Sequence, residues 1–399
     1  MNWQKKLLKI LIDTIVITLT TFIVSNFLIN NLSEAISIDP TEKKADIEFE
    51  DIYNRVANNR AVQSFNPNIV IIGVDSCSRS DIASLIDAVS YAEPKVIGMD
   101  VFFEFPGNDD DMLISAISDC DNIVLPLRMD YDIETDNFIN TQGSFFYSSL
   151  DDATYGVVNF PSDQSSVLRK FRPIFTTDSD SIDSFAAAIA LKFNNDSYRY
   201  LINRNNNLEN INFFATEFAE YDAFEIIDEK RFPRQGIEKI IHDKIVLIGG
   251  LNIATDKHIT PVDNSMSGVK VHAKIIDTII GKRYIRHSHH AIDLLISFIF
   301  CFLFAYINLC SKQSEKWNNI ESLLIRILQL GLVYILLVIG CRWFIKYNIS
   351  INFSCTLLMI CNTAIITDIW LGIKELYAKR GSTILLFKSI TNKTKKSKQ

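Results

Sequence analysis

The chain has 399 residues, of which 48% are hydrophobic and 22% are charged, and these totals match an ordinary globular protein. Charge is distributed unevenly: residues 29–288 hold 24 Lys and Arg against 41 Asp and Glu, a balance of −17, while the remaining residues carry +10. An acidic block repels phosphate backbones, and its aromatic residues are not interleaved with basic ones, so nucleic acid is excluded as a partner.

Four apolar segments are each long enough to cross the hydrocarbon core of a bilayer, which takes about 20 helical residues. They cover residues 7–29, 291–309, 323–345 and 349–373. The first segment follows several lysines, as a signal peptide does, but its apolar part is too long and no A-x-A cleavage pattern follows. It is therefore predicted to be an uncleaved signal anchor, with the lipid bilayer as partner.

Basic residues gather on one side of the four predicted spans. They precede the first span in residues 1–6, lie between the second and third at Lys312 and Lys316, and fill residues 374–399. Cytoplasmic segments carry the excess of Lys and Arg, so these regions are predicted to be cytoplasmic. Residues 30–290 then face away from the cytoplasm, in a multi-pass protein of the inner (cytoplasmic) membrane.

The first half of the acidic block alternates strand and helix patterns. Residues 69–74, 96–103 and 122–128 are apolar and rich in β-branched side chains, as strands covered on both faces require. Between them lie the amphipathic segments SRSDIASLIDAVSYAEPKV and DDMLISAISDC. Strand, helix, strand, helix, strand predicts a parallel sheet with right-handed crossovers.

The second half has weaker signals. GSFFYSS and GVVNFP predict an antiparallel extension, SFAAAIALKF a compact helix, and residues 195–235 peripheral turns plus a helix. DKIVLIGG predicts another buried strand, and VKVHAKIIDTII a closing helix that leads towards the second span. The predicted fold class is α/β: an extracytoplasmic three-layer domain with a mostly parallel sheet, plus a four-helix transmembrane region.

Two of the seven cysteines, Cys77 and Cys120, belong to the acidic block. Cys77 follows the end of one predicted strand, and Cys120 precedes the start of another. In a parallel sheet those positions are at opposite edges, so no disulfide is expected between them.

Seven segments in chain order carry a family resemblance: IVIIGVD, VIGMDVFF with the downstream DDD, NIVLPL, GVVNFP, SFAAAIALK, KIVLIGG and ITPVDNSMSGVKVHAKIIDTI. They are similar to the second CHASE domain family, the cyclase and histidine-kinase associated sensory extracellular domains of bacteria. The resemblance covers about residues 40–282, and the family's layout of one span before the domain and three after it matches too. It implies a sensor in a bacterial envelope, usually joined to a cytoplasmic cyclase, kinase or phosphatase domain.

The chain departs from that family pattern after its fourth predicted span. About 26 residues follow Ile373, too few to fold a catalytic domain. The expected function is therefore a sensor or receptor that relays its signal through a separate cytoplasmic signalling protein, with self-association into a homo-oligomer also possible. The alternative is a non-signalling membrane scaffold or envelope assembly protein. No cofactor is expected.

Carboxylates mark one edge of the predicted sheet. Asp75 and Asp100 end two apolar strands taken to be adjacent, and open α/β sheets bind ligands at this carboxyl edge. With Asp109, Asp110 and Asp111 they predict an acidic pocket for a divalent cation or an amine-bearing ligand. The alternatives are capping of the following helix by the trio and turn hydrogen bonding by the other two.

His272 lies in a segment that resembles the family's motif of an Asp, a following Thr-Pro and a later His-Ala, here Asp256, Thr260, Pro261, His272 and Ala273. It is a candidate ligand-binding residue, against the alternative of a histidine satisfied within the core. No metal site is predicted, because neither His258 with His272 nor the HSHH segment has suitably spaced third and fourth zinc ligands.

An enzyme is the rival class of protein. Ser76, Cys77 and Ser78 follow Asp75 at a predicted strand-to-helix turn and could supply a nucleophile. The chain contains no G-x-S-x-G elbow, H-E-x-x-H, Walker loop or Cys-His motif. The prediction is that the protein is not an enzyme.

Charged residues also occur inside the predicted spans. Asp13, Arg326 and Asp368 all fall near the inner ends of their spans. An unpaired charge at the bilayer centre costs about 2.5–3.5 kcal/mol on insertion scales, so the three are predicted to form a cluster that registers the first helix against the others. Snorkelling of each side chain to the interface is the alternative.

Overall fold

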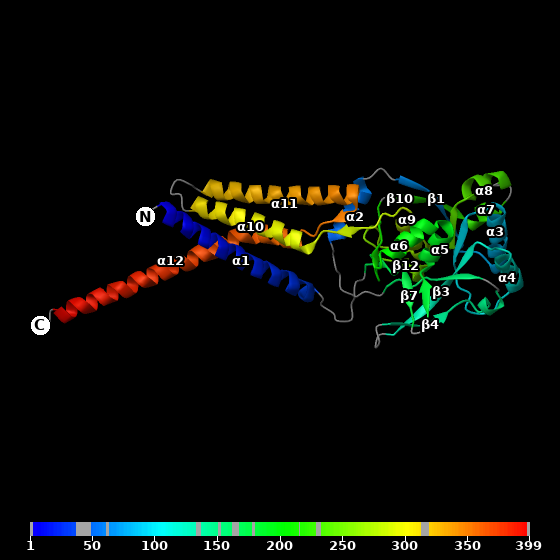
Figure 1. Cartoon of the computed structure of the whole chain (residues 1–399), viewed down its shortest axis with the longest axis horizontal. Helices are drawn as coiled ribbons and strands as arrows, with labels where there is room; N and C mark the ends of the chain where they lie inside the picture. Colours follow the sequence, from blue (N-terminus) through cyan, green and yellow to red (C-terminus); the bar gives the residue numbers. More distant parts are fainter. Residues whose placement is uncertain are drawn as a thin grey trace. The chain divides into compact units, whose positions relative to one another are not determined.

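The computed structural model describes residues 3–36, 49–60, 64–132, 137–150, 153–161, 167–177, 180–214, 216–228, 233–312 and 319–396. The chain forms two compact units (Figure 1). Residues 41–286 make an α/β unit, and residues 1–40 with 287–399 make a helical unit.

A seven-stranded sheet forms the middle of the α/β unit, in the order β10-β1-β11-β2-β3-β4, with β5 also beside β3. Among the described strands of this sheet, every pair is parallel except β3 with β4. The mostly parallel sheet predicted from the sequence is therefore confirmed. Its strands are β1 (Ser64–Gly73), β2 (Val96–Asp100), β3 (Ile123–Asp132), β4 (Asn137–Gln142), β5 (Thr154–Val157), β10 (Thr216–Asp222) and β11 (Ile245–Gly249).

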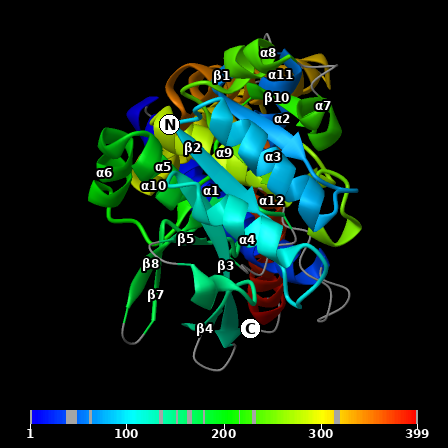
Figure 2. The same cartoon turned by 90° about the vertical axis from the view of Figure 1, so that its right-hand side faces the viewer.

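Helices cover both faces of the sheet. Ile69 and Ile71 of β1 pack in one core with helices α5 (Phe185–Phe193) and α9 (Gly268–Ile280). Val70 and Ile72 point the other way, into a core with α3 (Arg79–Tyr91) and α4 (Asp110–Ser118). Figure 2 looks onto the α3 and α4 layer. Successive side chains of a strand alternate between faces, so two covered faces explain why these strands are apolar without interruption.

Helix α3 shows how local sequence fixes these elements. Ser78 caps its first turn: the hydroxyl accepts a hydrogen bond from the Asp81 N–H at 3.2 Å, and the Asp81 carboxylate accepts one from the Ser78 N–H at 2.8 Å. This reciprocal capping box satisfies two amides that have no partner inside the helix. Hydrogen bonds donated to the Asp81 carboxylate by the Ser78 hydroxyl and by the Ser78 N–H lower the pKa of Asp81. Ile82 and Leu85 then bury the apolar face against the sheet.

The predicted antiparallel extension is wrong in its details. Residues 154–157, which overlap the GVVNFP segment, form β5 and pair parallel to β3. Residues 147–149 form the 3₁₀ helix η1 (Tyr147–Ser149), and the antiparallel strand is β4. β3 is long enough for β5 to pair with its first half and β4 with its second, an arrangement that short aromatic segments do not reveal.

The edge strand β10 falls where turns and a helix were predicted. Its sequence, TEFAEYD, buries Thr216 and Phe218 while Glu217 and Glu220 are exposed. Charged side chains are usual on an edge strand, where they discourage pairing with another chain. A strand of this kind contains no continuously apolar run, so the sequence pattern does not predict it.

Shorter elements complete the α/β unit and the connections. They are α2 (Phe49–Arg60), β6 (Lys170–Phe171), β7 (Ile174–Thr176), β8 (Ser181–Asp183), α6 (Asn195–Asn203), β9 (Glu209–Asn210), α7 (Ala223–Ile227), α8 (Arg234–Ile241), η2 (Ala254–Asp256), β12 (Lys257–His258), β13 (Met266–Ser267), β14 (Arg286–His287) and β15 (Ile349–Ser350). Helix α2 is held by a buried ion pair between Asp51 and Arg169, with 2.7 Å between Oδ2 and Nη2. None of the seven cysteines, each of which lies within a described segment, forms a disulfide bond.

The helical unit consists of α1 (Trp3–Ile36), α10 (His290–Lys312), α11 (Asn319–Tyr347) and α12 (Ser354–Lys396). Among the described residues these four helices contain stretches long and apolar enough to cross a membrane. Ile17, Ala305 and Ile366 join α1, α10 and α12 in a common apolar core. Other large apolar side chains, such as Ile23 and Leu330, are exposed, as a surface in contact with lipid requires. The protein is a membrane protein with four candidate spans.

Candidate functional site

Asp75 and Asp100 both lie at the carboxyl edge of the sheet, but on strands that are not neighbours. β11 runs between β1 and β2, which corrects the expectation of adjacent strands. Asp75 Oδ1 accepts hydrogen bonds from the N–H groups of Leu251 (2.8 Å) and Asn252 (2.9 Å), and its Oδ2 accepts one from Asn252 Nδ2 (2.9 Å). Asp75 therefore ties the turn after β1 to the loop after β11.

The acidic trio before α4 does not act together. Asp109 occupies the N-cap position in a left-handed conformation, and within the described residues its side chain makes no capping hydrogen bond. Asp110 instead binds Arg79 as an ion pair and accepts a hydrogen bond from the Gly107 N–H at 2.7 Å. Asp109 and Asp111 are exposed, so this stretch presents two carboxylates to solvent.

Asp100 and His272 are brought together. Asp100 is the last residue of β2, and His272 is in the second turn of α9. Their side chains are 14% and 5% exposed, with 3.9 Å between Asp100 Oδ2 and His272 Nε2, too long for a direct hydrogen bond. His272 Nδ1 is buried and has no hydrogen-bond partner among the described residues. A buried polar atom without a partner is costly, and such atoms are retained at functional sites.

Aromatic rings and a second imidazole surround this pair. The His272 ring stacks on Phe160, with 4.7 Å between centroids and 29° between planes, and meets Phe185 edge-on at 5.1 Å. His258, on β12, meets Phe160 edge-on at 4.8 Å. Its Nε2 lies 3.5 Å from Asp256 Oδ1. Two imidazoles thus contact Phe160, and each has a carboxylate within 4 Å.

Asp256 also fixes the start of α9. The Gly268 N–H donates to Asp256 Oδ2 at 3.1 Å, and within the described chain the N-cap residue Ser267 makes no side-chain capping bond. A carboxylate at a helix N-terminus stabilises the helix dipole. A Cβ at Gly268 would lie 2.5 Å from Asp256 Oδ1, so glycine is required for this contact.

Burial sets the charge of the central pair. It raises the pKa of Asp100 to about 7, helped by the negative charge of Asp256 and opposed by Arg128. It lowers the pKa of His272 to about 3, although Asp256 acts in the opposite direction. At neutral pH the imidazole is therefore neutral and the carboxyl partly protonated. The contact is a pair of poorly solvated polar groups that a ligand can satisfy, rather than an ion pair.

The intramembrane residues predicted to cluster fall into two ion-pair groups. Asp13 is buried and binds Lys374 Nζ at 2.5 Å and Trp370 Nε1 at 3.3 Å. Asp368 pairs with Lys312, and its Oδ2 is 3.9 Å from Arg326 Nη2. Arg326 thus lies beside Asp368, while a lysine neutralises Asp13.

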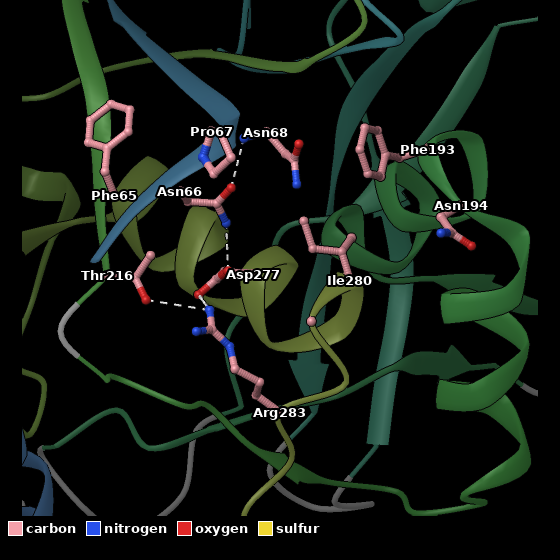
Figure 3. Close-up of a pocket in the computed structure, with 11 residues that line it drawn as sticks. Phe65, Asn66, Pro67, Asn68, Phe193, Asn194, Thr216, Asp277, Ile280 and Arg283 are labelled. Carbon is pink, nitrogen blue, oxygen red and sulfur yellow. Dashed lines mark hydrogen bonds and ion pairs between the residues drawn. The ribbon is translucent and has the colours of Figure 1, made fainter. Parts of the chain in front are cut away.

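A second polar region, which the sequence analysis missed, lies at the opposite edge of the sheet. A cavity there is lined by residues in the first half of β1, at the start of β10, at the end of α5 and at the end of α9 (Figure 3). Among its lining residues, Asn66 Nδ2 donates a hydrogen bond of 2.6 Å to Asp277 Oδ1. The available signal was Asp277 itself, an acidic residue within the apolar helix VKVHAKIIDTII.

The chain combines a mostly parallel α/β domain with four candidate membrane spans. The CHASE2 domain family model matches residues 51–307, and the chain belongs to this family. No curated protein and no solved structure matches it. The protein is therefore a membrane protein with a CHASE2 sensory domain, as the sequence resemblance implied.

Proposed function

We propose that this protein is a receptor that binds an amine-bearing signal molecule and relays the signal to a separate cytoplasmic protein. The CHASE2 domain faces away from the cytoplasm, across the inner membrane. The excess of Lys and Arg in residues 1–6 and 374–399 supports this orientation. The edge site binds its ligand and does not transform it.

Helix α9 carries the proposal. It holds His272 near its start and ends at Ile280, and α10 begins at His290. Nine residues, 281–289, therefore join the helix that supplies the buried imidazole to a candidate span. Most of α9 is buried, so it moves as a packed unit, and packed helices respond to a ligand by small shifts rather than by bending.

The chemistry of the edge site favours an ammonium group. Asp100 and Asp256 supply two carboxylates, and Phe160 supplies a ring that can contact a cation. Among the described residues no group of three metal-ligating side chains occurs, so an amine fits better than a divalent cation. A bound ammonium favours the ionised form of Asp100, and its binding therefore releases a proton at neutral pH.

Helix α12 supports relay on the cytoplasmic side. Its candidate span ends at Lys379, but the helix continues to Lys396. A helix that leaves the membrane without a break can transmit a displacement of its span. The basic residues of this extension suit an acidic partner surface.

A photo-crosslinking amino acid at Ser389, in the full chain in its own membrane, tests the relay. We expect crosslinks to a protein with a kinase, cyclase or phosphatase domain. Asp100→Asn should change their yield by about fivefold, the lower end of usual allosteric coupling, and the exposed control Glu104→Gln should not. Crosslinks confined to envelope assembly proteins, with the same yield in both variants, would support the scaffold alternative instead.

A further inference from the structure

The cavity at the amino edge of β1 has a volume of about 470 Å³, which is within the range of small-molecule sites. Phe65, Asn66, Pro67 and Asn68 form one wall, and Phe193 lies across from Asn68 (Figure 3). All of its lining residues belong to the α/β unit. It is separate from the Asp100 site, which lies at the carboxyl edge.

The charges in this cavity are already neutralised. Asp277 is 4% exposed and forms an ion pair with Arg283. Arg283 Nη2 also donates to Thr216 Oγ1 at 3.4 Å, and Asn66 holds the second oxygen of Asp277. Recognition of a charged ligand would require breaking this ion pair, which is unfavourable because its carboxylate is buried. The cavity therefore suits a neutral ligand.

Amide groups remain to bind that ligand. The exposed Asn68 side chain has no hydrogen-bond partner among the described residues, because only its backbone N–H is used, by Asn66 Oδ1 at 2.8 Å. Asn194 Oδ1 caps α6, which leaves its NH₂ group as a donor. Each amide NH₂ provides two donors and each amide oxygen an acceptor, a combination that matches hydroxyl and acetamido groups.

Two aromatic residues form the apolar walls of the cavity. Phe65, a residue that is 60% exposed, lies at one flank, and Phe193 lies at the other (Figure 3). Aromatic rings next to planar amides suit a ring with an apolar face and a polar rim. An extended peptide fits less well, because Pro67 lacks an N–H and the N–H of Asn68 is already bonded.

We propose that this cavity is a binding site for a neutral sugar unit. The rim of hydroxyl or acetamido groups bonds to Asn68 and Asn194, and the apolar face of the sugar ring lies against Phe65. Gly281 and Arg283 also line the cavity, and α10 begins at His290. A bound sugar therefore fixes the segment that leads from α9 to the second candidate span, independently of the amine site.

Saturation-transfer NMR and calorimetry on the full chain in nanodiscs test this site, with N-acetylglucosamine and its β-1,4-linked disaccharide as probes. We expect saturable binding that Asn68→Ala and Phe65→Ala each weaken by about tenfold, equivalent to roughly 1.4 kcal/mol. Phe105→Ala removes a phenylalanine that is 74% exposed elsewhere and should leave binding unchanged. Asp100→Asn should also retain sugar binding, which separates this site from the amine site.

Three results would overturn the sugar site. They are the absence of saturable binding to the unmodified chain, equal affinity in both cavity variants, and competition by L-glutamate, which would indicate a site for anions.

Discussion

Replacing Arg169 with methionine is expected to lower the free energy of unfolding of the α/β unit by about 3–5 kcal/mol. Arg169 Nε and Nη2 donate to the two Asp51 oxygens at 2.9 and 2.7 Å. Both side chains are buried, so the variant removes the positive charge that pairs with a poorly solvated carboxylate. Native-state hydrogen exchange of β1 and β11 amides measures the loss. Tryptophan fluorescence is not suitable, because all four tryptophans lie outside residues 41–286.

Two controls show whether the isolated charge causes this loss. Glu104→Gln breaks the exposed pair with Arg128, whose Nη1 is 3.3 Å from Glu104 Oε1, and should cost less than about 1 kcal/mol. The double variant Asp51→Leu with Arg169→Met removes both charges and should recover much of the stability. If the double variant is no more stable than Arg169→Met alone, packing rather than charge explains the effect.

The second large effect concerns Asp100 and His272. When either residue is replaced, the stability of the α/β unit is expected to depend on pH. The pKa of Asp100 is raised from 3.8 to about 7, so the folded state holds its proton more tightly and stability falls as pH rises through that range. The pKa of His272 is lowered from 6.5 to about 3, so stability falls as pH drops through its range. Between about pH 4 and 6.5 the two contributions oppose each other.

In each variant, the free energy of unfolding is therefore expected to change with pH in the direction set by the residue of the pair that remains. Asp100→Asn should lose stability as pH falls from 6.5 towards 3, and His272→Gln should lose it as pH rises from about 4 to about 7. The change in each case is roughly 4 kcal/mol over the range. Hydrogen exchange of β11 amides, corrected for intrinsic rates at each pH, gives both profiles. Parallel profiles for the two variants would contradict the assigned protonation states.

Local patterns predicted the strands but not their arrangement. Runs such as 69–74 and 245–249 were recognised because burial on both faces removes polar residues. Nothing in those runs specifies that β11 inserts between β1 and β2, since strand order depends on long-range packing. The edge strand β10 was missed because it carries the exposed charged residues Glu217 and Glu220.

Two residues of the edge site could be predicted from local sequence patterns. The end of an apolar strand marked Asp100, and the family motif marked His272. The roles of Asp75 and Asp110 depended on loop contacts that have no sequence signature. Asn66 and Asp277 meet across 211 residues, so the second cavity could only be found once the fold was known.

Cysteine labelling in intact cells is the most direct test of the central claim, that a sensory domain outside the cytoplasm is coupled to membrane helices. Ser181 is exposed on β8, and Ala378 is exposed near the end of the fourth candidate span. Each is replaced by cysteine, and labelling by a membrane-impermeant maleimide is measured as the gain over the parent chain.

We expect Ser181→Cys to react in intact cells and Ala378→Cys to react only after the membrane is opened. The opposite pattern would place the CHASE2 domain in the cytoplasm and contradict the receptor assignment.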